Sequence, residues 1–171
     1  NTGKGKYIIT SVNLKLNKPP HKLNTSYGAI ESELKEKNIK HPTIKDVSDA
    51  VIAIRQSKLP DPIKLGNSGS FFKNPVIAKD TFATFLHNNP EAPFYQISEN
   101  SYKIPAGWLI EQCGFKGKRF GDAGVHKKQA LVLVNYGDAS GQELLELAKK
   151  IQGAVLERFG ISINPEVNII G

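Results

Sequence analysis

Apolar residues recur every three or four positions in several stretches of this chain, which is the spacing of one helix face. The pattern is clearest over residues 144–159. Ser140 and Glu143 form a capping box in front of this stretch, and Gly160 suits the position just after it. We therefore predict a long amphipathic helix here, with its apolar face packed on a core.

Shorter helices are predicted in four other places. Thr43 and Asp46 resemble a second capping box, and apolar residues with helical spacing follow them until Pro60 forbids continuation. In the stretch 79–87, Phe82 and Phe85 are expected to face inward. The predicted ranges are 29–38, 43–57, 79–87 and 106–113.

Strand patterns complete the prediction. Residues 7–16 alternate between apolar and polar side chains, which predicts a strand with one buried face and an exposed edge. Residues 130–135 read as a continuous apolar strand, and short strands are predicted over 161–163 and 167–170. A chain that mixes these helices and strands is predicted to have an α+β fold.

The composition leaves two classes of partner open. The net charge of +7 suggests a nucleic-acid ligand, but the lysines are spread along the chain and match no known nucleic-acid module. A site for a nucleotide diphosphate would also favour positive charge. The charge alone therefore does not separate a basic binding module from an enzyme that handles an anionic small molecule.

Several features that the sequence lacks bear on membrane insertion, secretion and cellular compartment. No apolar run reaches the roughly 18 residues that a membrane span needs, and no signal peptide is recognised. The single cysteine, Cys113, excludes an internal disulfide, fits a reducing cytoplasm and is expected to be inertly buried. Because the chain contains no methionine, we expect it to be a piece of a longer protein.

The stretch 66–75 carries the main candidate chemistry. It reads Gly-Asn-Ser-Gly-Ser-Phe-Phe-Lys-Asn-Pro, so glycines that allow a tight turn precede Ser70, and Lys73 and Asn74 follow it. Such a loop can hold one hydroxyl beside an ammonium and an amide, which suits an oxygen-rich ligand. A plain glycine turn leading into a Phe-Phe core strand is the alternative.

Two further stretches give weaker signals. Residues 114–124 form a glycine-rich basic loop that could approach phosphates, but it matches neither the P-loop nor the dinucleotide fingerprint. His126 stands at a strand entrance, where histidines are usually structural. No cluster of cysteine, histidine and carboxylate residues has zinc-like spacing, so no metal is predicted.

Four blocks in order carry a resemblance to a known family. They are Lys-Leu-Pro-Asp-Pro at 58–62, Gly-Ser-Phe-Phe-Lys-Asn-Pro at 69–75, Gly-Trp-Leu-Ile-Glu-Gln-Cys at 107–113 and Pro-Glu-Val at 165–167. The chain resembles the C-terminal half of bacterial UDP-N-acetylenolpyruvoylglucosamine reductase. The resemblance implies a substrate-binding α+β domain over residues 61–164. Residues 1–60 would be the last strand and helices of a flavin-binding module, and 165–171 a return segment with a catalytic glutamate.

The family's activity is reduction of UDP-N-acetylglucosamine enolpyruvate to UDP-N-acetylmuramate, a peptidoglycan precursor, by NADPH through FAD. The resemblance implies a cytoplasmic monomer that binds neither membrane nor nucleic acid. Most flavin contacts and a catalytic arginine would precede residue 1, so we expect this chain alone to neither retain FAD nor turn over.

The family's functional residues match seven positions of this sequence. Ser70 would donate a proton and Glu166 would stabilise the enol form. The substrate-binding residues would be Tyr27, Lys58, Asn74, Tyr95 and Gln129. Taken singly, most have plainer explanations: Tyr27 and Tyr95 as packing residues, and Lys58 as a cation at a helix C-terminus. A basic nucleotide-sugar or nucleic-acid module without catalysis stays the competing hypothesis.

Overall fold

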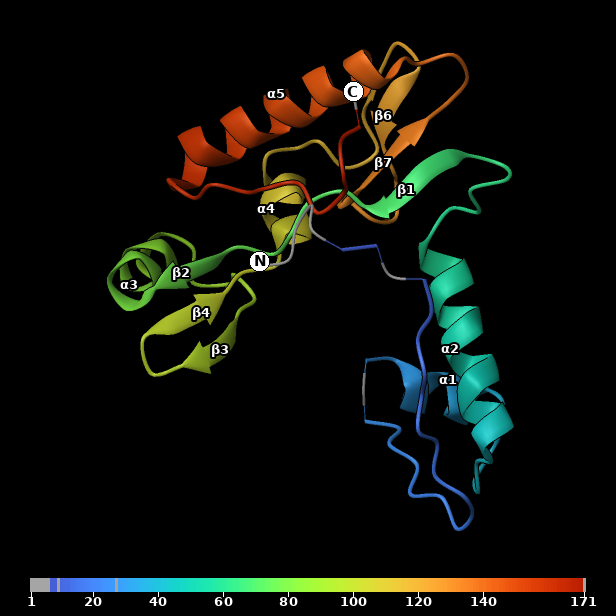
Figure 1. The fold of residues 1–171 in the computed structure, drawn as a ribbon. Helices are drawn as coiled ribbons and strands as arrows, with labels where there is room; N and C mark the ends of the chain where they lie inside the picture. The colour runs from blue at the N-terminus through green and yellow to red at the C-terminus, as the bar shows by residue number, and fades with distance from the viewer. Residues whose placement is uncertain (1–6, 9, 27, 171) are drawn as a thin grey trace. The chain divides into compact units, whose positions relative to one another are not determined.

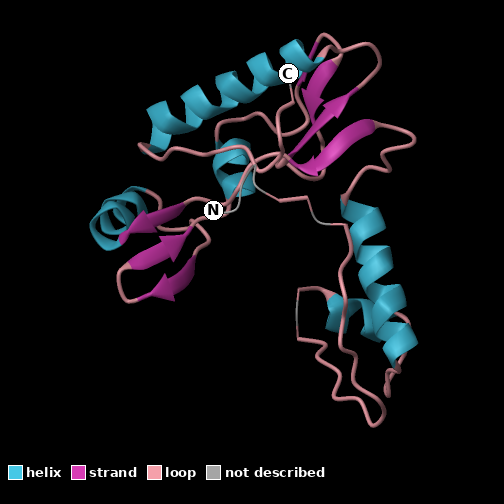
Figure 2. Cartoon of the chain, in the orientation of Figure 1, coloured by secondary structure: helices cyan, strands magenta, loops and turns pink. Residues whose placement is uncertain are grey.

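The computed structural model describes residues 7–8, 10–26 and 28–170. The chain divides into two units, Asn1–Ile54 and Arg55–Gly171 (Figure 1). The domain boundaries given above remain a prediction. The mixture of helices and antiparallel sheets makes the fold α+β, as predicted (Figure 2).

The first unit contains helix α1 (Ile30–Glu36) and most of helix α2 (Ile44–Lys58). Ile30, Leu34 and Ala50 form its small buried core. The predicted capping box is present, since the Thr43 backbone N–H donates to Asp46 Oδ2 at 2.8 Å and the Asp46 N–H to Thr43 Oγ1 at 3.3 Å. The Thr43 hydroxyl, which donates to Asp46 Oδ2 at 2.6 Å, and then the Thr43 N–H lower the pKa of the Asp46 carboxyl.

The predicted strand over residues 7–16 is wrong for the part of that range that the structure describes. Residues 7–8 and 10–16 form no strand, and their apolar side chains are exposed, including Val12 and Leu16 at 73% and 81%. A strand needs a partner for its backbone hydrogen bonds, and alternation of side chains does not supply one.

The second unit is built on a four-stranded antiparallel sheet in the order β1-β7-β6-β5. Its strands are β1 (Gly66–Ser70), β7 (Val132–Asn135), β6 (Ala123–Val125) and β5 (Arg119–Phe120). Helix α5 (Gly141–Phe159) packs along one face, over β6 and β7 (Figure 1).

The predicted long helix is confirmed in detail. Ser140 and Glu143 form the capping box, and Gly160 follows the helix in the left-handed conformation with φ 66°. The hydrogen bonds to Ser140 lower the pKa of the Glu143 carboxyl. Leu147, Ile151 and Val155 are buried along the apolar face.

A smaller three-stranded sheet has the order β2-β4-β3, with strands β2 (Val76–Ala78), β4 (Ser101–Lys103) and β3 (Tyr95–Ser98). Helix α3 (Lys79–Asn88) packs on β2 and β4, and its Phe82 ring stacks on Tyr102 with centroids 3.8 Å apart. Phe82 and Phe85 are buried, as predicted.

Helix α4 (Ala106–Gln112) packs against α5. Its Leu109 and Ile110 belong to the buried hydrophobic cluster that also contains the apolar face of α5. Trp108 lies edge-on to Phe85, with ring centroids 6.0 Å apart, and so acts as a packing residue. Neither this helix nor any other among the described residues is long and apolar enough to span a bilayer.

Two predicted local structures are corrected. The glycine-rich loop 66–70 is strand β1, because Gly69 at φ 75° and a bulge accommodate the chain next to β7. Residues 161–163 and 167–170 form no strands, and the segment makes a single bridge, from Pro165 to Phe72.

Candidate functional site

Ser70 ends strand β1, and its side chain is exposed beside two buried phenylalanines. Phe71 and Phe72 are 7% and 1% exposed, and their rings meet edge-on. The Phe71 N–H donates to the Leu131 carbonyl at 2.7 Å, which fixes the chain directly after Ser70. The aromatic pair thus anchors the backbone and leaves the hydroxyl at the surface.

Glu166 lies next to this strand end although it is 96 residues away in sequence (166 − 70). Its backbone N–H donates to the Phe71 carbonyl at 2.7 Å, and the Lys73 N–H donates to the Asn164 carbonyl at 2.9 Å. Both side chains, Ser70 and Glu166, are exposed. The fold therefore brings the two predicted catalytic residues into one neighbourhood.

Asn74 uses its side-chain oxygen inside the protein. Its Oδ1 accepts the backbone N–H of Ala106 at 2.9 Å, at the first turn of α4, where Pro105 offers no capping side chain. Since an N–H group requires an acceptor, this contact fixes which end of the amide is oxygen. The amide nitrogen makes no hydrogen bond within the described part of the chain, so it remains available as a donor.

Gln129 lies against Gly107, the second residue of α4, and its side-chain oxygen is also held inside the protein. Its Oε1 accepts the Leu131 backbone N–H at 3.4 Å and would lie 3.3 Å from a Cβ placed on Gly107. Its amide nitrogen likewise makes no hydrogen bond to a described residue. Asn74 and Gln129 therefore both lie against the start of α4, each with an unused N–H₂ group.

Lys58 is the last residue of α2 and is exposed. The residue before it accepts a hydrogen bond through its backbone carbonyl: Lys128 Nζ donates to Ser57 O at 2.9 Å. Because Lys128 precedes Gln129 directly, this bond ties the end of α2 to the Gln129 segment. Sequence reasoning had not singled out Lys128, whose position next to Gln129 was the available signal.

Tyr95 lies further from this group. It pairs with Lys103 on β4, which pairs with Val76 on β2, so the three residues form one row across the small sheet. The Tyr95 side chain is 62% exposed, which excludes the core-packing role within the described residues. Tyr27, the remaining predicted residue, lies outside the residues that the structure describes.

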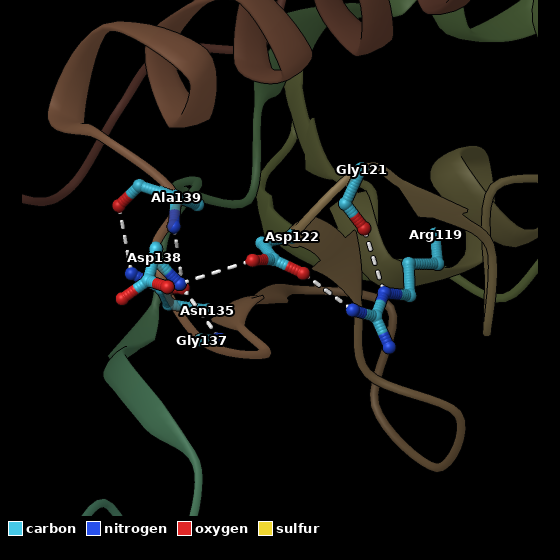
Figure 3. Close-up of polar contacts among 7 residues, drawn as sticks. All are labelled: Arg119, Gly121, Asp122, Asn135, Gly137, Asp138 and Ala139. Carbon is cyan, nitrogen blue, oxygen red and sulfur yellow. Dashed lines mark hydrogen bonds and ion pairs between the residues drawn. The ribbon is translucent and has the colours of Figure 1, made fainter.

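The basic loop 114–124 is held by internal contacts. Arg119 donates to the Gly121 carbonyl at 2.6 Å and to Asp122 Oδ1 at 2.5 Å (Figure 3). Its guanidinium also lies 4.6 Å from the Tyr136 ring centroid. Asp122 also accepts the Asp138 N–H at 3.1 Å. These bonds lower the pKa of the Asp122 carboxyl, the Asp138 N–H most, and they give Arg119 a structural role.

The remaining groups with possible reactivity are the Cys113 thiol, a metal site and His126. Burial raises the pKa of the Cys113 thiol, which disfavours the reactive thiolate. Among residues 7–8, 10–26 and 28–170, no three histidine, cysteine or carboxylate side chains are grouped to hold a metal ion. His126 is buried, with its Nδ1 unpaired.

The site therefore combines a hydroxyl, two free amide donors and an ammonium on an open surface, with one carboxylate beside the hydroxyl. A surface so rich in donors suits an oxygen-rich anionic small molecule. The fold is of the α+β class, and these donor groups lie on its exposed surface.

Comparison with known proteins identifies the family. The model of the UDP-N-acetylenolpyruvoylglucosamine reductase C-terminal domain matches residues 61–170, so the chain belongs to this family. A reductase of that name from Flavobacterium johnsoniae is 64% identical over 99% of this chain and 50% of its own length. One from Chromobacterium violaceum is 49% identical over 97% of this chain and 48% of its own.

The chain thus spans about half the length of these relatives. A crystal structure of the reductase from Thermus caldophilus is 23% identical, with a TM-score of 0.44 over 78% of this chain and 35% of that one. That score is too low for any of its geometry to be transferred.

Proposed function

We propose that this chain is the substrate-binding half of an NADPH-dependent flavoenzyme that reduces UDP-N-acetylglucosamine enolpyruvate to UDP-N-acetylmuramate. The observation that carries the proposal is the pair of amides at the start of α4. Asn74 and Gln129 each commit the oxygen to a backbone N–H and keep the nitrogen as a donor. Such preset donors suit the many acceptor oxygens of a nucleotide sugar.

Lys58, Asn74 and Gln129 would orient the nucleotide sugar. Lys58 Nζ makes no ion pair within the described residues, so its charge is available to an anionic ligand. Tyr95, with its exposed ring, would lie near the diphosphate or the nicotinamide. Tyr27 is proposed as a further diphosphate contact from its sequence position alone.

Ser70 would deliver the proton that the reaction requires. When the carbon–carbon double bond accepts a hydride at its terminal carbon, negative charge develops on the carbon that bears the carboxylate, and that carbon must be protonated. A serine hydroxyl is a weak acid, so the step depends on placement. The buried Phe71 and Phe72 hold the backbone beside Ser70 and so limit its movement.

Glu166 would help to stabilise the enol form. A carboxylate next to an anionic group is favourable only when it is protonated or acts through a cation. Its position is determined by backbone bonds of the return segment rather than by its own side chain. That arrangement leaves the carboxylate oxygens available to a ligand or to an arginine of the longer protein.

FAD reduced by NADPH would supply the hydride. The Ser70 side chain is exposed, so it is accessible to a group held by another part of the longer protein. We assign no residue of this chain to holding the flavin. We expect this chain alone to neither retain FAD nor turn over.

The test is substrate-dependent oxidation of NADPH by the longer protein that carries this chain. Ser70→Ala should lower kcat by about 10²- to 10⁴-fold, the usual contribution of a positioned acid, while flavin reduction by NADPH keeps its rate. Full turnover in Ser70→Ala would contradict the assignment. Salt-sensitive binding of DNA or RNA, with no response to the nucleotide sugar, would favour the competing basic module.

A further inference from the structure

Strand pairing places His126 in the same row of the large sheet as Ser70. Ser70 on β1 pairs with Val132 on β7, and the His126 N–H donates to the Val132 carbonyl at 2.9 Å, one residue beyond the pairing of Val125 with Leu133. Directly paired residues of antiparallel strands share a face. Ser70, Val132 and His126 therefore point to one side, with the outer two backbones roughly 10 Å apart.

This side is opposite the one that α5 covers. Leu133 and Val125 belong to the cluster packed on α5, whereas Val132 and Val134 do not, although both are 0% exposed. The alternating residues of β7 thus line two different interfaces, and His126 belongs to the interface that continues from Ser70.

The segment that carries Lys58 lies against this second side. Asn67 pairs with Val134, and its side-chain nitrogen donates to the carbonyls of Leu65 at 2.8 Å and Pro60 at 3.4 Å. Lys128 Nζ donates to the Ser57 carbonyl. The turn after α2 is thereby attached to both flanks of the Ser70–Val132–His126 row.

The two ring nitrogens of His126 differ in their burial, and neither has a hydrogen-bond partner among the described residues. The residue is 8% exposed, and its Nδ1 is buried without a partner among the described residues. Nε2 makes no hydrogen bond to a described residue and is not fully buried, so it keeps some contact with solvent. Burial and the charges of Lys127 and Lys128 lower the pKa of the imidazole, which keeps it neutral.

The neutral ring must place its one proton on Nδ1 or on Nε2. An orphaned buried N–H is rarer than an orphaned buried acceptor, because an acceptor tolerates the loss better. The proton therefore belongs on Nε2, where the ring reaches the surface. His126 then presents one uncharged N–H donor on the Ser70 side of the sheet, near the charges of Lys127 and Lys128.

We propose that the Nε2–H of His126 donates a hydrogen bond to an acceptor oxygen of the nucleotide sugar bound over Ser70. This inference rests on the proposed function, and it adds a binding residue to the same site. His126 does not exchange a proton in the reaction. It extends the set of neutral donors formed by Asn74 and Gln129.

The test begins with ¹⁵N-histidine NMR of the 171-residue chain, in which the signals of His126 are identified by their loss in His126→Gln. We expect the Nε2–H form in the free chain and a displacement of the Nε2 resonance when UDP-N-acetylglucosamine enolpyruvate is added. The Nδ1–H form, or an Nε2 resonance unmoved at saturating ligand, would overturn the proposal. Both readings are taken on the unaltered chain, and His126→Gln serves only to identify the His126 signals.

Calorimetric affinities then separate a ligand contact from a purely structural histidine. His126→Gln keeps a donor near the Nε2 position and should bind within about threefold of the parent, whereas His126→Phe should bind about three- to tenfold more weakly. Trp108 fluorescence checks that both variants fold. If Lys58→Ala weakens binding and His126→Phe does not, the inference fails while the proposed function stands. If no nucleotide sugar binds the folded chain, both fail.

Discussion

Replacing Asn74 separates its structural role from its proposed ligand role. In Asn74→Ala the Ala106 N–H loses its acceptor, and Ala106 is 0% exposed, so water cannot replace it fully. Losing a helix cap costs about 1 kcal/mol, and leaving a buried N–H unpaired costs about 1–3 kcal/mol. We expect the free energy of unfolding to fall by about 1–2 kcal/mol.

Asn74→Asp is the matched variant. A carboxylate keeps an acceptor for the Ala106 N–H, and its negative charge is favourable at a helix N-terminus, so stability should change by less than about 0.5 kcal/mol. The same change removes the N–H₂ donor and adds a charge that repels an anionic ligand. Affinity for UDP-N-acetylglucosamine enolpyruvate should therefore fall at least about tenfold, the value of a hydrogen bond to a charged group.

Urea unfolding followed by Trp108 fluorescence measures the first effect, since the single tryptophan lies in α4, two residues after Ala106. Calorimetric titration measures the second. If Asn74→Asp is destabilised as much as Asn74→Ala, the cap does not exist as described. If Asn74→Asp binds the nucleotide sugar like the parent, the free amide nitrogen has no role in the site.

Other predictions test the packing and the titrating groups. Gly124→Ala should destabilise the second unit by about 1–3 kcal/mol, because the added Cβ would lie 2.7 Å from the Tyr136 ring and 3.0 Å from the Lys118 carbonyl. A Cβ added at Gly153, inside α5, would meet nothing within 4 Å, so Gly153→Ala should instead stabilise the unit by about 0.5–1 kcal/mol. Thermal unfolding measures both changes. Gly160→Ala should cost about 1–2 kcal/mol, since φ 66° strains any residue with a Cβ; an unchanged melting temperature would contradict that reasoning. The lowered pKa of His126 means that the unfolded chain binds the proton more readily. Stability should therefore be complete above pH of about 6.5 and decline as pH falls towards the folded pKa, and His126→Gln should remove that part of the pH dependence in urea titrations.

The helices could be predicted from sequence because their signals are local. Capping pairs at Thr43 and Ser140, together with helical apolar spacing, determine where α2 and α5 begin. Strands are harder because their partners are distant. Residues 7–16 have the alternation of a strand but no described partner, whereas Gly66–Ser70 lacks that alternation and becomes a strand by pairing with β7.

The candidate site was predictable only as separate blocks. The Ser70 stretch and Pro165–Glu166 stand out in sequence, but the bond from the Glu166 N–H to the Phe71 carbonyl is a tertiary contact that no local pattern encodes. The same is true of Asn74 at the start of α4 and of Lys128 at the Ser57 carbonyl. His126 has no signal of its own in the sequence, since its interest comes from burial and strand register.

The most direct test of the account is a calorimetric titration of the 171-residue chain with UDP-N-acetylglucosamine enolpyruvate, repeated with Ser70→Ala and Lys58→Ala. The account predicts saturable binding that Ser70→Ala leaves within about twofold and that Lys58→Ala weakens about tenfold, as expected for loss of a charged contact. Absence of binding heat at millimolar ligand from a folded sample would contradict it, because the donors of Lys58, Asn74 and Gln129 would then not form a substrate site on this chain.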